Sequence, residues 1–357
     1  MKNHFLITLL LLMLVVFAIS CSRQVVLMPG ATDNDGRYDT EFPGPAFARA
    51  LDEISESVLK IYCLAEYDRY YIDTAIFFTQ SDLAASLLSQ RTTMRDNFSE
   101  SVHGSATLLR NSGGRLVLLT CAHIFDYPDT VISYYESLDR FAAPGIESVA
   151  IKRKQTQFIQ EFSVSESFDI IAIDYDLDIA FLGTKNERLT NDKLPAFDYA
   201  AGDDQLLDRG SVVYVFGFPA GFQMVTRALV ANPNIGKNGT FLVNANFNEG
   251  ISGGAVMAMH DGPLNLQLVG IAKSASASYS NVIKPEHESH QQRYNPNLPY
   301  EGQLFVDQQR TLNYGVTFAI SILTIRDFYL LNRRRFVASG YNLDEFFQSG
   351  TRKKRGE

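Results

Sequence analysis

Short apolar segments recur from Gly104 onward, separated by turns and with little helical spacing between them. Asn111-Ser112-Gly113-Gly114 and His260-Asp261-Gly262 are typical of hairpin turns. Many short strands joined by turns indicate an all-β barrel or sandwich architecture. The expected strands are Ser105–Leu109, Leu116–Thr120, Val149–Lys152, Ile170–Ile173, Ile179–Leu182, Val212–Phe216, Phe241–Val243, Ala255–Met259, Leu266–Ile271 and Val316–Ile320.

Other segments surround this β framework. Phe47–Leu59 has the apolar spacing of a short helix, and residues 57–72 are rich in β-forming side chains. Residues 79–95 also have helical spacing and are predicted to be a helix. The polar residues 276–310 are predicted to form a long loop, and Ile322–Arg335 a terminal helix.

The N-terminus has the features of an export signal. An apolar run from Phe5 to Ile19 is too short for a comfortable transmembrane helix, but it suits a signal peptide. It ends at Ser20-Cys21, which resembles the lipobox of bacterial lipoproteins. This resemblance implies cleavage after residue 20, lipidation of Cys21, and a protein exported to the periplasmic or cell-surface side of a bacterial membrane. Residues 21–45 are then a polar tether. The alternative is a plain secretory signal with an incidental cysteine.

The net charge and the cysteine content limit the expected partners and disulfides. The formal net charge is −8, and no long basic run occurs outside the extreme C-terminus, so nucleic acid is not an expected partner. Besides Cys21, the chain contains only Cys63 and Cys121. An exported protein permits a disulfide between these two, while two separate buried thiols remain the equal alternative.

Gly250-Ile251-Ser252-Gly253-Gly254 is the strongest chemical motif. A serine hydroxyl needs a base and an oxyanion hole to act as a nucleophile, and glycines let the backbone turn sharply and aim N–H groups into one space. Gly250 and Ser252 are the expected oxyanion donors. A simple glycine-rich turn is one alternative. The nucleophile elbow of α/β-hydrolases is another, and it is disfavoured because a strand, not a helix, is expected after the motif.

Two further motifs each place a polar side chain beside an apolar strand. His123 follows the segment Arg115–Ala122, where a packed strand end would hold a general base in one orientation. Asp178 precedes the apolar run Ile179–Leu182, whereas Asp174 and Asp176 are interpreted as turn residues. Taken singly, each motif also fits an ordinary strand end or turn.

The order His123, Asp178, Ser252 in an all-β context resembles the chymotrypsin-fold (trypsin-like) serine peptidases. The segment TCAH is similar to the family's T-A-A-H, DIAFL to its D-I-A-L-L, and GISGG to its G-x-S-G-G. Four more segments resemble the bacterial HtrA-type branch: HGSATLL, FGFPAGF, NEGISGG and YGVTFAI. No PDZ-length segment follows residue 330, so the resemblance is to a protease domain alone.

The resemblance implies two packed antiparallel six-stranded β-barrels with a few peripheral helices. The peptidase domain is expected at residues 46–335, with barrels at roughly 55–185 and 186–330 and a tail at 336–357. It implies a lipid-anchored endopeptidase with a catalytic triad of His123, Asp178 and Ser252, acting on peptide or protein substrates without a cofactor or metal.

Two alternatives remain open on the sequence. One is a pseudo-peptidase with the same fold that acts as a surface binding or scaffold lipoprotein. The other is a non-enzymatic lipoprotein of unrelated β fold. His287 and His290 invite a metal interpretation, but a polar loop without a cysteine partner favours a solvated segment. The basic runs 333–335 and 352–355 are likewise expected to be solvated.

Overall fold

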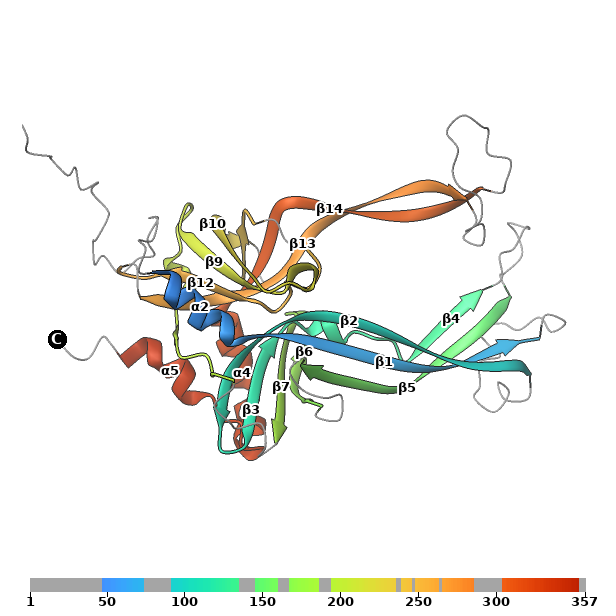
Figure 1. The fold of residues 1–357 in the computed structure, drawn as a ribbon, viewed down its shortest axis with the longest axis horizontal. Coiled ribbons are helices and arrows are strands. Elements are labelled where there is room, and N and C mark those ends of the chain that lie inside the picture. Colours follow the sequence, from blue (N-terminus) through green and yellow to red (C-terminus); the bar gives the residue numbers. More distant parts are fainter. Residues whose placement is uncertain are drawn as a thin grey trace, which may run out of the picture.

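The computed structural model describes residues 47–73, 91–134, 145–159, 167–185, 194–235, 239–245, 248–262, 265–285 and 304–352. These residues form two antiparallel β-sheets with a few helices at one end (Figure 1). Every strand predicted from the apolar segments lies inside an observed strand. The mainly-β class is therefore confirmed.

The first sheet has seven strands in the order β4-β5-β1-β2-β3-β7-β6, and every neighbouring pair is antiparallel. Among the described residues its two edge strands do not pair, so this sheet stays open. Its strands are β1 (Val58–Ile72), β2 (Thr92–Ser112), β3 (Arg115–Thr120), β4 (Thr130–Tyr134), β5 (Ile146–Ile159), β6 (Asp169–Asp174) and β7 (Ile179–Lys185).

The second sheet closes on itself. Its order is β12-β9-β10-β11-β14-β13, and an additional β12–β13 pairing completes a six-stranded antiparallel ring, while short β8 adds in parallel to β13. Its strands are β8 (Ala200–Ala201), β9 (Val212–Gly217), β10 (Met224–Ile235), β11 (Thr240–Val243), β12 (Ala255–Met259), β13 (Leu266–Pro285) and β14 (Leu304–Ser321).

The expectation of two six-stranded barrels is thus correct for the second sheet and wrong in detail for the first. Strands β1, β2 and β5 are long and run beyond the core, and β4 pairs with the outer part of β5. Because the outer strands spread along this extension, the edge strand β4 does not meet β6, and the first sheet lacks ring closure.

Strand β9 explains how the two sheets pack. Val212, Tyr214 and Phe216 belong to one buried cluster, which also holds Leu118 and Phe181 of the first sheet. The alternate residues Val213 and Val215 belong to a second cluster inside the closed ring. A strand buried on both faces appears in sequence as a continuous apolar run, so the sequence predicts a strand here without indicating which residues share a face.

Helix α2 (Ala48–Glu56) matches the short helix expected before β1. Helix α4 (Ile322–Ala338) is capped by Ser321, whose hydroxyl accepts hydrogen bonds from the N–H groups of Leu323 and Thr324. The expected C-terminal tail, residues 336–357, is partly helical. It contains helix α5 (Asp344–Arg352), and Phe336 and Phe347 are buried. No helix in the described part of the chain is long and apolar enough to cross a bilayer.

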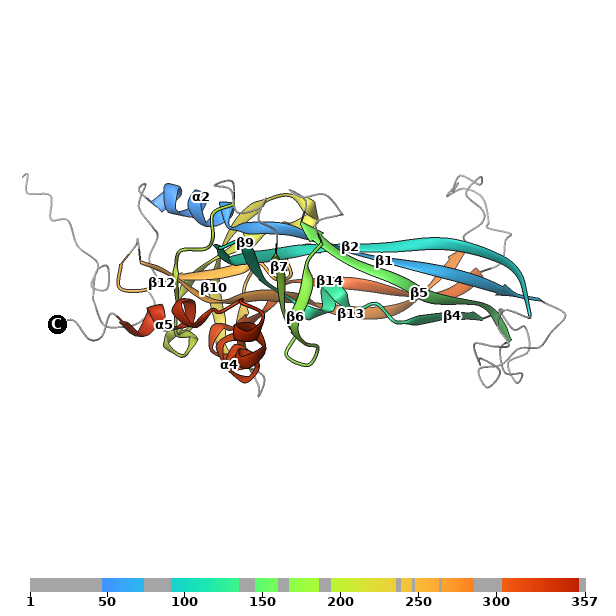
Figure 2. The same cartoon turned by 90° about the horizontal axis from the view of Figure 1, so that it is seen from below.

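Two further predictions are corrected by the long strands. Residues 92–95 of the predicted helix 79–95 belong to β2 and pair with the end of β1, and residues 74–90 lie outside the described residues. Both ends of the predicted loop 276–310 are strand, since β13 runs to Pro285 and β14 begins at Leu304. Polar side chains can face water on both sides of a paired ribbon, so composition alone does not reveal such a ribbon. Both extensions point toward the same end of the molecule, away from α2 and α5 (Figures 1 and 2).

Candidate active site

His123 lies in a single 3-10 turn, η3 (Ala122–Phe125), which directly follows β3. The turn is anchored by Ala122, Ile124 and Phe125, all of which are buried. In contrast, 44% of the His123 side chain is exposed. The buried neighbours therefore hold the imidazole in place while leaving part of the ring accessible.

Asp178 ends the turn between β6 and β7 with a φ of 62°, a left-handed conformation that is uncommon for residues other than glycine. The carboxylate of Asp174 stabilises this turn by accepting hydrogen bonds from the N–H groups of Asp176 and Leu177 at 3.0 and 2.9 Å. Asp174 is thus a turn residue, as predicted. The turn directs Asp178 inward, where only 6% of its side chain is exposed.

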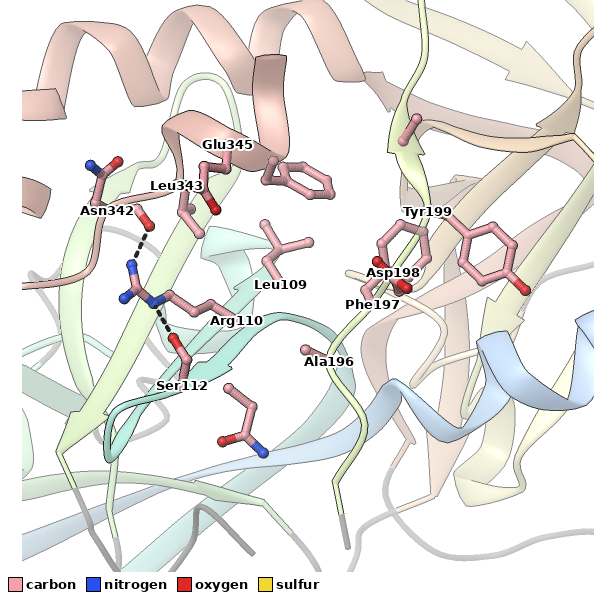
Figure 3. Close-up of a pocket in the computed structure, with 13 residues that line it drawn as sticks. Leu109, Arg110, Ser112, Ala196, Phe197, Asp198, Tyr199, Asn342, Leu343 and Glu345 are labelled. Carbon is pink, nitrogen blue, oxygen red and sulfur yellow. Dashed lines mark hydrogen bonds between the residues drawn. The ribbon is translucent and has the colours of Figure 1, made fainter. Parts of the chain in front are cut away.

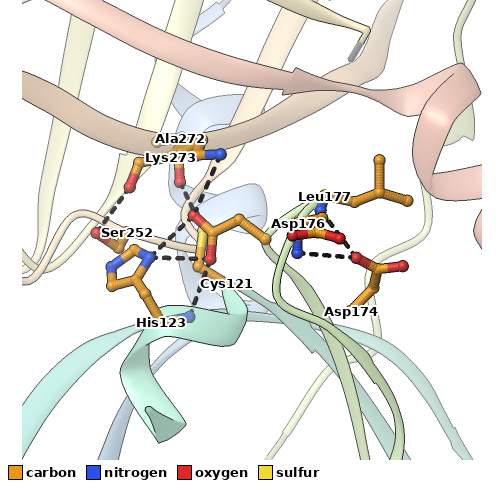
Figure 4. A network of polar contacts seen from close by, with 9 residues as sticks. Cys121, His123, Asp174, Asp176, Leu177, Ser252, Ala272 and Lys273 are labelled. Atoms are coloured by element: carbon orange, nitrogen blue, oxygen red, sulfur yellow. Dashed lines mark hydrogen bonds and ion pairs between the residues drawn. The ribbon is translucent and has the colours of Figure 1, made fainter.

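The carboxylate of Asp178 receives hydrogen bonds from both the ring and the main chain of His123 (Figure 4). His123 Nδ1 lies 2.9 Å from Oδ2 and 3.0 Å from Oδ1, and the His123 main-chain N–H donates to Oδ1 at 2.9 Å. An ionised carboxylate only accepts, so Nδ1 carries the proton in this contact and, in a neutral ring, Nε2 keeps its lone pair. The imidazole is thereby set up to take a proton at Nε2.

Ser252 lies in the loop before β12, and strand β2 of the other sheet holds this loop. The main-chain N–H of Ser105 donates to the carbonyl of Ser252 at 2.8 Å. The Ser105 hydroxyl donates to the carbonyl of Gly250 at 2.7 Å and accepts from the N–H of Phe218 at 2.8 Å. One buried serine therefore links the loop of the second sheet to the first sheet.

The motif Gly250–Gly254 contributes five main-chain N–H groups to this loop. Those of Ile251, Gly253 and Gly254 donate to main-chain carbonyls. Among the described residues, the N–H groups of Gly250 and Ser252 have no acceptor. Gly250 has a φ of 100°, which only glycine adopts readily. The two donors predicted for an oxyanion hole are thus the two that remain available.

The hydroxyl of Ser252 donates to the carbonyl of Lys273 at 2.9 Å and has no hydrogen bond to His123 within the described part of the chain (Figure 4). The side chain of Lys273 also lies close to Asp178, with Nζ 3.8 Å from Oδ2. The structure therefore brings together all three residues predicted as the triad. It also adds a lysine whose direction the sequence did not reveal.

Cys121 is the remaining polar neighbour of this group. Its buried thiol donates to the carbonyl of Ala272 at 3.3 Å, and burial together with the Asp178 carboxylate raises its pKa well above the ordinary value. Cys63 is also buried, and desolvation raises its pKa to about 12. Both are free thiols, so the structure decides against a disulfide between them.

Ligand-capable atoms of Cys121, His123 and Asp178 lie within 4.8 Å of one another. A divalent cation there would need the thiolate form of Cys121, which burial disfavours, and it would meet the ammonium of Lys273 beside Asp178. This donor set therefore does not fit a metal. His287 and His290, which the sequence predicts to lie in a solvated loop without a metal, are outside the described residues.

Ser105 and His103 also contact the serine loop, and the sequence alone does not predict these contacts. Both lie in the segment HGSATLL, but their contacts to the serine loop depend on packing between the sheets. Among the described residues His103 Nε2 is buried without a hydrogen-bond partner, and a Cβ added to Gly250 would lie 2.6 Å from it. Desolvation, followed by the charge of Lys60, lowers the pKa of His103.

A pocket of about 790 Å³ lies apart from this group, between β2, the segment 196–200 and the start of α5 (Figure 3). Arg110 crosses it and donates to the carbonyl of Asn342 and to the hydroxyl of Ser112. None of the three triad residues lines this pocket, so it is not the candidate active site.

Comparison with known proteins relates part of the chain to one family. Residues 104–271 match the family model described as a trypsin-like peptidase domain. No curated protein matches this chain.

Three solved structures that resemble the chain are the following. The HtrA-type protease AlgW, solved with a decapeptide, is 16% identical over 82% of this chain and 67% of its own, with a TM-score of 0.40. A serine endoprotease from Yersinia pestis is 15% identical over 82% and 68%, with a TM-score of 0.39. Deg5 is 16% identical over 81% and 96%, with a TM-score of 0.39. Likeness at this level bears on neither substrate nor mechanism.

Proposed function

Since residues 104–271 of this chain match the model of a trypsin-like peptidase domain, we propose that the protein is a serine endopeptidase whose triad is His123, Asp178 and Ser252. One observation carries the proposal: the His123–Asp178 pair lies beside Ser252 (Figure 4), and the N–H groups of Gly250 and Ser252 have no acceptor among the described residues. A base, an orienting acid and an oxyanion site are the parts that acyl transfer by serine requires.

In this mechanism Ser252 Oγ attacks the carbonyl carbon of a peptide bond while Nε2 of His123 takes the hydroxyl proton. Asp178 keeps the ring in one tautomer and stabilises the imidazolium that forms. The negative oxygen of the tetrahedral intermediate accepts hydrogen bonds from the N–H groups of Gly250 and Ser252. His123 then protonates the leaving amine, and water repeats the sequence to release the acid from Ser252.

We also propose that the protein is exported and carries a lipid on Cys21, which would hold the domain at a membrane surface. The support is the sequence pattern alone, an apolar run that ends in small residues and a cysteine. Its test is the intact mass of the chain purified from bacteria. We expect loss of residues 1–20 and a mass increase from acylation, both abolished by Cys21→Ser.

A second candidate is a pseudo-peptidase that only binds polypeptides. It is favoured by the hydrogen bond from the Ser252 hydroxyl to Lys273, since this bond directs the hydroxyl away from His123. In that case the hydroxyl would stay in this position even when a substrate is bound.

Covalent labelling separates the two candidates. The purified full chain in detergent is treated with a fluorophosphonate probe, and the adduct is measured by intact mass. We expect one adduct on the wild type and none on Ser252→Ala or His123→Ala. Ser101→Ala, which changes an exposed serine on β2, serves as the matched control and should label like the wild type. A folded wild type without adduct would favour the pseudo-peptidase.

A further inference from the structure

Lys273 occupies an irregular position in β13. In the pairing of β13 with β14, Ala272 lies opposite Ala319 while Ser274 lies opposite Phe318. Lys273 is therefore the extra residue of a β-bulge. Bulges re-aim a side chain and its carbonyl, and they occur often beside active sites.

The bulge directs two groups of Lys273 at the triad. Its carbonyl accepts the hydrogen bond from the Ser252 hydroxyl at 2.9 Å. Its Nζ lies 3.8 Å from Asp178 Oδ2, with 29% of the lysine side chain exposed. The aliphatic stem is thus largely buried, while the ammonium shares the carboxylate with His123. A lysine with these contacts is not free to move as a solvated surface lysine would be.

We infer that Lys273 is a positioning residue of this site: its ammonium shares the Asp178 carboxylate with His123 and thereby sets the pH range in which the imidazole is an unprotonated base. This inference refines the proposed function, and its kinetic test rests on that function. The spectroscopic test below does not.

The direction of the effect follows from charge. A carboxylate beside an imidazole stabilises the protonated ring, and a second cation at the same carboxylate weakens that stabilisation. Among the residues that the structure describes, Asp178 and Lys273 are the charged groups of this cluster, and the neutral thiol of Cys121 is its titratable neighbour. Asp126, in the same turn as His123, is exposed. Removing the ammonium should therefore let His123 hold its proton to a higher pH.

Three variants isolate the charge. Lys273→Met keeps most of the buried stem and removes the ammonium, while Lys273→Arg keeps a cation at the same place. Lys284→Met is the matched control, because Lys284 lies on the same strand but pairs with Asp307 at 2.6 Å.

The first measurement is an NMR titration of the full chain with labelled histidine. The chain has six histidines, and His123→Ala identifies the signal of interest. We expect the pH of half-protonation of His123 to rise by about 0.5 unit in Lys273→Met, a modest shift for a neighbouring charge that is partly exposed to water. Lys273→Arg and Lys284→Met should stay at the wild-type value. An unchanged midpoint in Lys273→Met, or an equal rise in Lys273→Arg, would overturn the inference whether or not the protein is an enzyme.

The second measurement is the pH profile of kcat/KM, or of the labelling rate with the fluorophosphonate probe. A rise of 0.5 unit corresponds to about threefold lower kcat/KM on the acidic limb and no loss on the plateau. A merely structural role would lower the rate equally at every pH, and this outcome would contradict the inference. If the wild type does not react at all, the proposed function fails, while the NMR result still decides the role of Lys273.

Discussion

The hydroxyl of Ser105 donates a hydrogen bond to the main-chain carbonyl of Gly250 at 2.7 Å, across the interface between the two sheets. Because Ser105 also receives the N–H of Phe218, it holds two segments of the second sheet at once. The Ser105 residue is fully buried, so water cannot replace these bonds. The position of the serine loop depends on a residue that takes no part in the chemistry.

Ser105→Ala should therefore both destabilise the protein and lower the rate at which Ser252 is labelled. Each main-chain group left buried without a partner costs about 1–3 kcal/mol, so we expect a loss of about 2 kcal/mol or more in the free energy of unfolding. The fluorophosphonate labelling rate should fall as well, because the donors of Gly250 and Ser252 lose their fixed position. Denaturant titration and labelling kinetics measure the two effects. Ser101→Ala on the same strand is the control. If the Ser105→Ala variant is less stable but is labelled at the wild-type rate, the loop is held by other contacts.

Gly253 lies where the two sheets approach each other closely. Its φ is 85°, and an added Cβ would overlap the carbonyl oxygen of Ser105 and the hydroxyl of Thr120. Gly113 also has a positive φ, of 59°, but an added Cβ meets nothing within 4 Å. Gly113→Ala should cost only the backbone strain of about 1–2 kcal/mol. Gly253→Ala should cost much more, or prevent folding. Equal melting temperatures for the two variants would contradict the close approach.

Asp178→Asn is expected to reduce the reaction rate with little loss of stability. The amide has the shape of the carboxylate and can still accept the His123 N–H, but it cannot stabilise an imidazolium. In a triad of this kind the loss is about ten-thousand-fold in kcat. Asp176→Asn, in the exposed part of the same turn, should react as the wild type does. Peptide hydrolysis and thermal unfolding, measured side by side, distinguish the predicted loss of catalysis from a loss of fold.

The cysteines should be unreactive in the native protein. Burial raises the pKa of the Cys63 thiol to about 12 and that of Cys121 well above its ordinary value, so almost no thiolate forms at pH 8. We expect iodoacetamide to modify neither residue until the chain is unfolded, and then both. With Cys21 lipidated, no thiol should react in the native state. Rapid modification of Cys21 in the native protein would contradict the proposed lipid anchor. Rapid modification of Cys63 or Cys121 in the native protein would contradict the observed burial of these thiols.

The C-terminal helices should lose stability in acid. Asp344 accepts hydrogen bonds from Arg333 and Tyr329, and the bond from Arg333 is the largest cause that lowers its pKa from 3.8 to about 2. A lowered pKa stabilises the folded state above the unfolded value, and this contribution is lost as the pH falls from about 4 to about 2. Asp344→Asn should therefore melt at a lower temperature than the wild type at pH 7, and the difference should shrink below pH 4. Glu345→Gln, exposed in the same turn, should show neither effect.

Much of the strand framework could be predicted from local sequence. Segments such as Leu116–Thr120 and Val212–Phe216 are apolar, rich in β-formers and bounded by turns, and these are local properties. The same holds for the turn at Asp174, because an aspartate that bonds to the backbone two and three residues later acts within one turn. His123, Asp178 and Ser252 could be proposed as a triad because each stands beside such a strand.

The tertiary structure alone determined the contacts between distant segments. The open first sheet, the conformation of the Gly250–Ser252 loop and the direction of the Lys273 side chain all depend on how the two sheets pack. A bulge changes the direction of a side chain through its pairing with another strand, and a one-residue shift in pairing leaves no periodic signal in the chain itself. The sequence by itself therefore determined which residues could form the site. Packing between strands far apart in the chain determined how those residues face one another.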